Sequence, residues 1–169
     1  PAVAGAFYPA DPATLLADIR AYLDAAQSLA PQTTDGAPKA LIVPHAGYIY
    51  SGKTAALGYK LVQGSDFETV VILGPTHRVD FRGASIWPEG AFETPLGAAE
   101  VDAEAARALA KATGFRFIPE AHAEDSDLCH SFPLNSFRLF VLAAPYTAVG
   151  KAQRFHLLTK GGAHFRFQG

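Results

Sequence analysis

Two histidines of this chain follow hydrophobic runs that have the length of buried strands. His45 comes after residues 39–43, of which the last four are apolar, and a proline, and His77 comes after residues 69–73 and the tripeptide Gly-Pro-Thr. Neutral imidazole is the commonest protein ligand of transition metals such as iron, copper and zinc. Because ligands of open α/β sheets gather at the carboxyl ends of the strands, we expect both imidazoles to face one metal ion there. Taken alone, either histidine fits a loop or packing role better than a metal site. A metal site is favoured because the same arrangement, a hydrophobic run followed by a histidine, occurs twice.

A phosphate-binding motif overlaps the first histidine. Residues 47–54 match the pattern G-x-x-x-x-G-K-[ST], between an expected strand and an expected helix. A phosphate loop must wrap backbone amides around phosphates, whereas Tyr-Ile-Tyr places bulky, β-favouring side chains in these turns. The next hydrophobic run ends in Gly-Pro and not in an aspartate that could hold magnesium. We therefore interpret Lys53 and Thr54 as helix residues, and a phosphate-loop nucleotidase is the least favoured function.

Composition limits the class of protein. With 169 residues, of which 49% are hydrophobic and 18% charged, the chain can form one compact domain with its own core. The formal net charge of -2 gives no reason to expect nucleic acid or a membrane surface as partner. The single cysteine, Cys129, has no internal partner for a disulfide, which fits a reducing compartment. No basic, apolar leader or long apolar segment is present, so we expect a cytoplasmic protein.

Helical and strand-like patterns alternate along the chain. Asp11 before Pro12 is a good start for a first helix, and Asp102 is a good cap for an alanine-rich one. Strand, helix and strand with continuous apolar runs predict an α/β fold whose mostly parallel sheet is flanked by helices. The expected helices cover residues 12–28, 51 or 52 to 63, and 102–113; the expected strands cover 39–43, 69–73, 84–87 and 115–118; loops are expected at 31–38 and 93–97.

The last part of the chain differs in charge from the rest. All 16 acidic residues precede Ser136, whereas basic residues continue to Arg166. We therefore divide the chain into an α/β domain over residues 1–135 and a basic C-terminal segment over 136–169. This segment could be an anion-binding arm of the same domain or an aberrant, truncated or out-of-frame end.

Four ordered motifs resemble the Memo family, whose prokaryotic members are called AmmeMemoRadiSam system protein B. They are Pro-Ala-Val-Ala-Gly-Ala-Phe-Tyr-Pro at residues 1–9, Pro-His-Ala-Gly-Tyr-Ile-Tyr-Ser-Gly at 44–52, Val-Ile-Leu-Gly-Pro-Thr-His at 71–77 and Thr-Pro-Leu-Gly at 94–97. The resemblance implies a three-layer fold similar to that of class III extradiol dioxygenases, which use non-haem Fe(II). It also implies that His45 and His77 are metal-site residues, that a later cysteine completes the set, here Cys129, and that the metal is iron or copper, with zinc as a further option.

The resemblance changes character after His122. Ser-Asp-Leu-Cys-His at residues 126–130 resembles a Ser-Asp-Phe-Cys-His motif that the family carries much later in its chain. The resemblance thus makes Asp127 and His130 candidate proton carriers, although a deletion, a frameshift or coincidence would each produce this segment. Typical members extend well beyond residue 169, so we expect this chain to be truncated. His122 itself is a lone histidine, for which we predict no role.

The sequence leads to a metal-dependent oxidoreductase or dioxygenase-like enzyme acting on an unknown small-molecule substrate. A non-catalytic metal-binding or interaction scaffold, which would have a protein partner, is the alternative from another class. Neither nucleic acid nor a membrane is expected as a partner, and the oligomeric state is not predicted.

Overall fold

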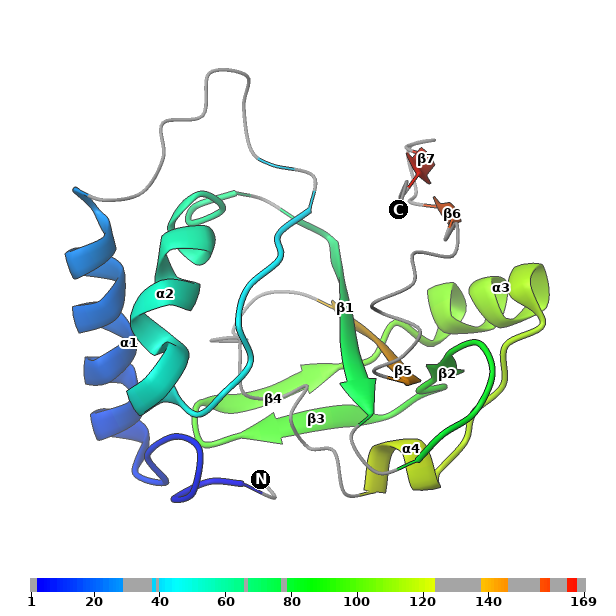
Figure 1. The fold of residues 1–169 in the computed structure, drawn as a ribbon, viewed down its shortest axis with the longest axis horizontal. Helices are drawn as coiled ribbons and strands as arrows, with labels where there is room; N and C mark the ends of the chain where they lie inside the picture. The colour runs from blue at the N-terminus through cyan, green and yellow to red at the C-terminus, as the bar shows by residue number, and fades with distance from the viewer. Residues whose placement is uncertain are drawn as a thin grey trace. The chain divides into compact units, whose positions relative to one another are not determined.

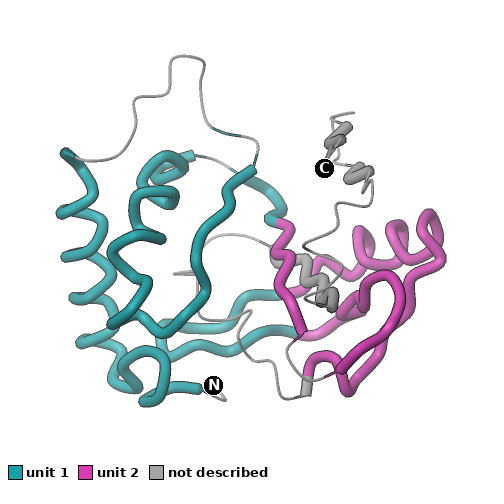
Figure 2. Tube along the Cα trace, viewed as in Figure 1, with its two compact units in different colours: residues 1–70, 91–100, 126–138 teal, residues 71–90, 101–125, 139–169 magenta. Residues whose placement is uncertain are grey.

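A computed structural model describes residues 3–28, 38, 40–65, 67–76 and 79–123, together with the backbone of three strands further on. The chain divides into two compact units (Figure 2). Unit 1 comprises Pro1–Val70, Ala91–Glu100 and Ser126–Arg138, and unit 2 comprises Val71–Gly90, Val101–Asp125 and Leu139–Gly169. Each unit has its own cluster of buried apolar side chains.

The order of elements mixes helices and strands (Figure 1). They are α1 (Pro12–Ala26), α2 (Tyr48–Lys60), β1 (Thr69–Thr76), β2 (Ser85–Ile86), β3 (Ala91–Thr94), β4 (Gly97–Glu100), α3 (Ala103–Thr113), α4 (Glu120–Ala123), β5 (Arg138–Pro145), β6 (His156–Leu158) and β7 (His164–Arg166). The predicted α/β class is therefore confirmed at the level of mixed helices and strands.

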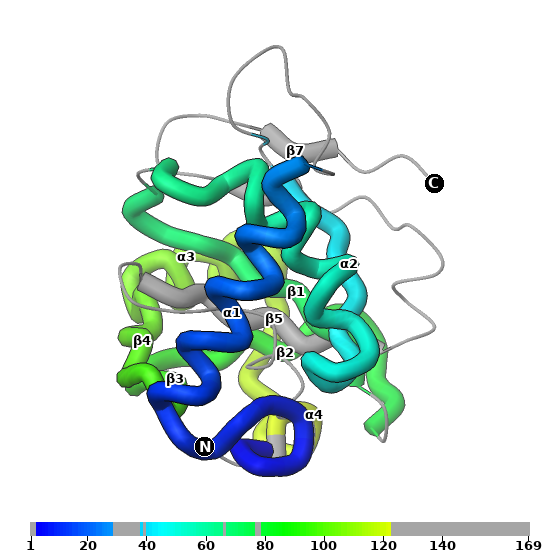
Figure 3. Tube along the Cα trace, turned by 90° about the vertical axis from the view of Figure 1, so that its left-hand side faces the viewer, coloured from blue at the N-terminus to red at the C-terminus, as the bar shows by residue number. Residues whose placement is uncertain are grey.

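Unit 1 is built around two helices that pack side by side (Figures 1 and 3). The Asp11 carboxylate accepts a hydrogen bond from the Thr14 amide at 2.8 Å, and Pro12 fits the first turn of α1 with its fixed φ. Helix α1 then buries Leu15 and Ile19 against Tyr8, which forms the core of this unit. The sequence predicted this helix because both its cap and its apolar face are local signals.

Two glycines allow close packing against α2. A Cβ atom built on Gly52 would lie 2.8 Å from the Tyr22 ring, and one built on Gly58 would lie 2.7 Å from Cγ1 of Val43. Real Cβ atoms do not approach so closely, because interiors are already packed to the density of organic crystals. Gly52 therefore lets the Tyr22 side chain of α1 lie against α2.

A hairpin also belongs to unit 1. Strands β3 and β4 are antiparallel, with Thr94 opposite Gly97 across the turn. Gly97 has φ of +133°, a backbone conformation that glycine adopts readily and other residues avoid. Of the predicted loop at residues 93–97, only residues 95–96 form the turn, because Glu93 and Thr94 belong to β3 and Gly97 to β4. These short strands were not predicted.

Unit 2 contains a three-stranded sheet in the order β1-β5-β2 and helix α3. Asp102 caps α3 by accepting a hydrogen bond from the Ala105 amide at 3.0 Å, and Gly114 ends the helix with φ of +73°. Ala84, Ile86 and Ala106 form the core, with Leu109 and Phe115 among the side chains packed against them.

The strand predictions were only partly right. Residues 69–73 and 84–87 contain β1 and β2, but the predicted strand at 39–43 is wrong, because the described residues 40–45 form no ladder. In that segment Val43 contacts α2 while Ile42 is 95% exposed, so only one face of the apolar run is covered. The predicted strand at 115–118 is reduced to a single bridge, between Arg116 and Ser85.

Strands β2 and β5, β3 and β4, and β6 and β7 pair antiparallel. Parallel pairing occurs in two isolated bridges, Ala4 with Tyr8 and Ser85 with Arg116. A mostly parallel sheet therefore stays a prediction. The helix expected from residue 51 or 52 begins earlier, at Tyr48, because Gly47 takes the N-cap position.

Candidate functional site

His45 is the predicted metal ligand that the structure describes. Its half-buried side chain lies at the end of the extended segment, just before Gly47 and the first turn of α2. The Tyr48 amide donates a 2.8 Å hydrogen bond to the Phe7 carbonyl, and the Ser51 hydroxyl donates a 2.7 Å hydrogen bond to the Ala46 carbonyl. A Cβ atom on Gly47 would lie only 3.3 Å from the Phe7 carbonyl oxygen. The backbone after His45 is thus fixed on both sides of the turn.

The other predicted site residues lie outside the described residues: His77, Asp127, Cys129 and His130. Their convergence with His45 therefore stays a prediction. Immediately before His77, Thr76 is buried, and its hydroxyl donates a 2.6 Å hydrogen bond to the Val79 carbonyl. This hydrogen bond links Thr76 and Val79, the residues on either side of positions 77 and 78.

The donor set itself suits a transition metal. Two imidazoles and a thiolate are ligands of the kind that iron, copper and zinc accept, whereas calcium and magnesium prefer oxygen. Within the described part of the chain, no group of three or more His, Cys, Asp or Glu side chains lies close enough together to hold a metal ion. Of the three predicted donors, His45 is the one that lies among the described residues.

The phosphate-loop motif does not form a loop. Residues 48–54 lie inside α2, where Lys53 and Thr54 are exposed on the surface of the helix. Backbone amides engaged in helical hydrogen bonds cannot wrap around a phosphate. The glycine of the motif has a packing role, since Gly52 makes room for Tyr22. The structure thus agrees with the helical interpretation of Lys53 and Thr54.

A second histidine, His122, is the centre of a polar contact in unit 2. Its Nε2 atom lies 2.8 Å from the hydroxyl oxygen of Ser85, and that oxygen accepts a 2.8 Å hydrogen bond from the Ile118 amide. Ser85 is 0% exposed and His122 is 9% exposed. The contact joins β2, the segment before α4 and α4 itself, since these three residues come from those three parts of unit 2.

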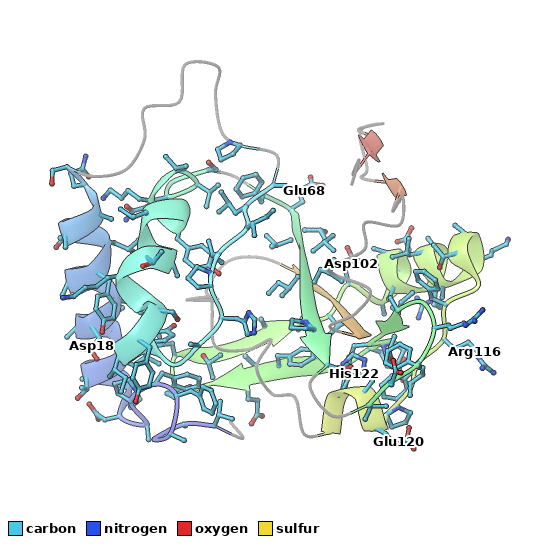
Figure 4. All side chains as sticks on the ribbon, in the orientation of Figure 1. Asp18, Glu68, Asp102, Arg116, Glu120 and His122 are labelled. Atoms are coloured by element: carbon cyan, nitrogen blue, oxygen red, sulfur yellow. The ribbon has the colours of Figure 1, made fainter. Side chains whose placement is uncertain are left out.

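Aromatic rings complete the surroundings of His122. The Trp87 ring lies edge-on to the imidazole at a centroid distance of 5.2 Å, and the Phe117 ring lies at 5.7 Å. The charged side chains of Arg116 and Glu120 are exposed and point outward (Figure 4). A hydroxyl next to an imidazole can act as a nucleophile, but a nucleophile must reach its substrate. Ser85 is fully buried, so this pair is a structural anchor.

Sequence reasoning gave no role to His122, and the single sequence carries no signal for its contact with Ser85. The two residues are 37 positions apart, and neither belongs to a periodic pattern that predicts the other. Only the folded chain shows that His122 is a buried packing residue in contact with Ser85.

The family described as "Memo-like protein" matches residues 1–144. The chain belongs to the Memo family. A MEMO1 family protein of Thermococcus kodakarensis is 41% identical over 133 residues, which cover 78% of this chain and 42% of that protein. A MEMO1 family protein of Methanothermobacter thermautotrophicus is 42% identical over 126 residues, covering 71% of this chain and 45% of that protein.

This Memo-family chain therefore spans less than half the length of these curated relatives. The family match continues past residue 135, the predicted boundary of the α/β domain, and ends within β5. Among the described residues, no helix is both long enough and apolar enough to span a membrane.

Proposed function

We propose that this Memo-family chain contributes His45 and His77 as ligands of a transition-metal site. The observation that supports this most is the fixed turn after His45, where backbone and side-chain hydrogen bonds hold Gly47 and Ala46 in place. A ligand on such a turn needs little reorganisation to meet a metal ion, which favours tight binding. Family membership supports the same site through the two histidine-containing motifs.

The remaining assignments follow from the sequence. Cys129 would be the third ligand, and Asp127 and His130 would move protons between the substrate and solvent. Bound iron or copper would supply Lewis-acid and redox chemistry. The function is then that of a metal-dependent, dioxygenase-like oxidoreductase with an unidentified small-molecule substrate, in a three-layer fold with a mostly parallel sheet.

Metal analysis tests this proposal directly. Protein purified without added metal should contain iron, copper or zinc, and both His45→Ala and His77→Ala should lose most of it. His156→Ala is the matched control, because it removes a histidine outside the predicted site and should leave the metal content unchanged. Equal metal content in all four proteins, or none in any of them, would overturn the proposal.

An interaction scaffold remains as a second function because unit 1 exposes large apolar side chains. Ile42, Ile49 and Tyr50 are at least 80% exposed, and Ile49 and Tyr50 are neighbours at the start of α2. Neighbouring exposed apolar side chains are candidates for protein contact. Replacing Ile49 and Tyr50 by aspartate should abolish partner capture and leave metal content unchanged if the chain is a scaffold. If His45→Ala and His77→Ala lose turnover while the aspartate substitutions at Ile49 and Tyr50 have no effect, the chain acts as an enzyme.

A further inference from the structure

A buried contact in unit 2 joins α4 to β2 through a side chain that can take up a proton. Nε2 of His122 on α4 lies 2.8 Å from Oγ of Ser85 on β2, and both side chains are buried. Histidine ordinarily changes its charge between about pH 5 and about pH 8. We propose that this contact is a pH-dependent latch, which holds α4 while His122 is neutral and releases it when His122 becomes charged. The latch goes beyond the proposed metal site, because it needs no bound metal.

The hydrogen bonds of Ser85 indicate which ring nitrogen of His122 carries the proton. The Ile118 amide donates a 2.8 Å hydrogen bond to the Ser85 hydroxyl oxygen. The hydroxyl hydrogen can point to Nε2 of His122, at 2.8 Å, or to the Ile118 carbonyl, at 3.4 Å. Hydroxyl hydrogen bonds to oxygen usually measure about 2.5–3.0 Å, so the hydroxyl donates to Nε2. Neutral His122 is therefore an acceptor at Nε2 and carries its proton on Nδ1.

Protonation of His122 opposes this arrangement in two ways. A charged imidazole has a hydrogen on both ring nitrogens, so Nε2 would meet the Ser85 hydroxyl hydrogen donor to donor. The hydroxyl can turn away only toward the Ile118 carbonyl, which lies beyond the usual hydrogen-bond distance. The charge would also be buried beside the rings of Trp87 and Phe117, where it loses its hydration.

Among the described residues, charged side chains on the neighbouring elements do not offset this cost. Arg116 belongs to the segment before α4, Glu120 is on α4 and Glu89 follows β2, and all three side chains are exposed. Arg116 and Glu120 point outward (Figure 4). Residues 124 and 125, which are acidic, lie outside the described residues. A neutral His122 is thus the form that fits the described surroundings.

Helix α4 is the element that the latch would release. It has four residues, Glu120–Ala123, and isolated helices of this length are not stable in water. The Ala121 amide donates a hydrogen bond to the Ile118 carbonyl, and the His122 amide donates one to the Pro119 carbonyl. Ala121 and His122 are buried residues of this helix, so its attachment depends on contacts such as that of His122 with Ser85.

Nuclear magnetic resonance of the full chain tests the latch. Near neutral pH, the nitrogen shifts of the His122 ring should identify the Nδ1–H tautomer. Below about pH 6.5, hydrogen-exchange protection of the Ile118 and Ala121 amides should fall about tenfold per pH unit, because the released form binds one more proton. The Ala106 amide of α3, which donates to the Asp102 carbonyl, should stay more than tenfold better protected throughout, because the release is local.

His122→Gln separates the latch from general sensitivity to acid. A glutamine carbonyl can accept the Ser85 hydroxyl but does not titrate, so protection of the Ile118 and Ala121 amides should no longer fall below about pH 6.5. His156→Gln, which removes another histidine of unit 2, should retain the fall. Should His122→Gln fail to fold, the tautomer and the amides of the unaltered chain still decide.

Four results would overturn the latch. They are the Nε2–H tautomer near neutral pH, titration of His122 without loss of protection at Ile118 and Ala121, protection of these two amides equal to that of Ala106, and an unchanged fall in His122→Gln.

Discussion

His45 in unit 1 and His122 in unit 2 differ in what holds them. His45 ends an extended segment in which Ile42 is almost fully exposed, and the turn after it is fixed by bonds of neighbouring residues. His122 is buried, contacts the fully buried Ser85 and lies beside the rings of Trp87 and Phe117, which also neighbour each other. The ring with a strong sequence context is half-buried, and the ring without such context is buried. Sequence context and structural burial therefore mark two different kinds of histidine.

The exposed apolar side chains of the two units also differ. Unit 1 leaves Ile42, Ile49 and Tyr50 at least 80% exposed, whereas in unit 2 Leu73 and Phe117 are 44% and 40% exposed and the core includes Ile86 at 2% exposure. A residue in a tight core resists change, whereas a residue on an open surface tolerates it. Matched substitutions in the two units therefore test this difference.

The largest effect is expected from a pair of isoleucines. Ile86→Ala in unit 2 should lower the free energy of unfolding by about 2–5 kcal/mol, because it removes buried atoms and leaves a cavity. Ile42→Ala should change it by less than about 0.5 kcal/mol, because the side chain is already in water. Urea unfolding followed by circular dichroism measures both. Equal losses would show that Ile42 is covered in solution and that the contrast between the units is wrong.

A pair of buried serines should give a smaller difference. Ser85→Ala removes the oxygen that accepts a hydrogen bond from the Ile118 amide and contacts His122. Because a buried donor is then left without its acceptor, the free energy of unfolding should fall by about 1–3 kcal/mol. Ser51→Ala removes one hydrogen bond to the carbonyl of Ala46, an exposed residue where water can replace the donor, so about 0.5–1.5 kcal/mol is expected. The same unfolding measurement applies. A larger loss for Ser51 would mean that the turn after His45 is the more rigid of the two regions.

The effect of Gly52→Ala on stability should depend on whether the Tyr22 ring is present. Alanine stabilises the interior of a helix by about 1 kcal/mol relative to glycine, so Gly52→Ala should stabilise the protein once Tyr22→Ala has removed the ring that it would meet. In the unaltered chain, the clash with Tyr22 should cancel or reverse this gain. Lys53→Ala, at an exposed position, should change stability by less than about 0.5 kcal/mol in both backgrounds. An equal gain from Gly52→Ala with and without Tyr22 would refute the packing role.

Acid conditions should affect unit 1 through the cap of α1. Hydrogen bonds from the Thr14 hydroxyl and then from its amide lower the pKa of Asp11 below 3.8. A carboxyl group whose pKa is lower in the folded state stabilises the fold above its ordinary pKa, and this contribution is lost as the pH falls through the folded value. Asp11→Asn should therefore lose less stability than the unaltered chain between about pH 5 and about pH 3.

The control for the Asp11 prediction is Asp18→Asn, which also removes one carboxylate from α1 but leaves the cap intact. Its unfolding midpoint should follow that of the unaltered chain over the same pH range. Identical acid responses of the Asp11 and Asp18 variants would contradict a role for Asp11 as the titrating cap.

The elements predicted best are those whose signals are local. Asp11 with Pro12, and Asp102 before an alanine-rich run, define helix starts within a few residues, and the structure places α1 and α3 there. Strand β1 was found because Thr69–Thr76 contains a continuous apolar run. Family membership was likewise predictable, since four short motifs carry it.

Elements that depend on distant partners were missed. An apolar run at residues 39–43 cannot reveal whether a neighbouring strand will pair with it, and Val43 packs against Gly58 of α2 instead. The β3–β4 hairpin depends on Gly97 at its turn, next to residues that are poor strand formers. The contact of His122 with Ser85 joins residues far apart in the sequence. For the metal site, the sequence supplies His45, His77 and Cys129 as donors, and their arrangement in space stays a prediction.

Trp87 gives unit 2 a fluorescence signal of its own. Trp87 is the chain's single tryptophan, its ring lies against both His122 and Phe117, and its indole nitrogen donates a hydrogen bond to the Glu89 carbonyl. Tyr8, Tyr22, Tyr48, Tyr50 and Tyr59 all belong to unit 1. Emission excited at the red edge of the tryptophan band will therefore follow unit 2 alone, and near-ultraviolet signals of tyrosine will follow mainly unit 1. An optical melt of the unlabelled protein can thus reveal whether the two units lose their structure together or one after the other.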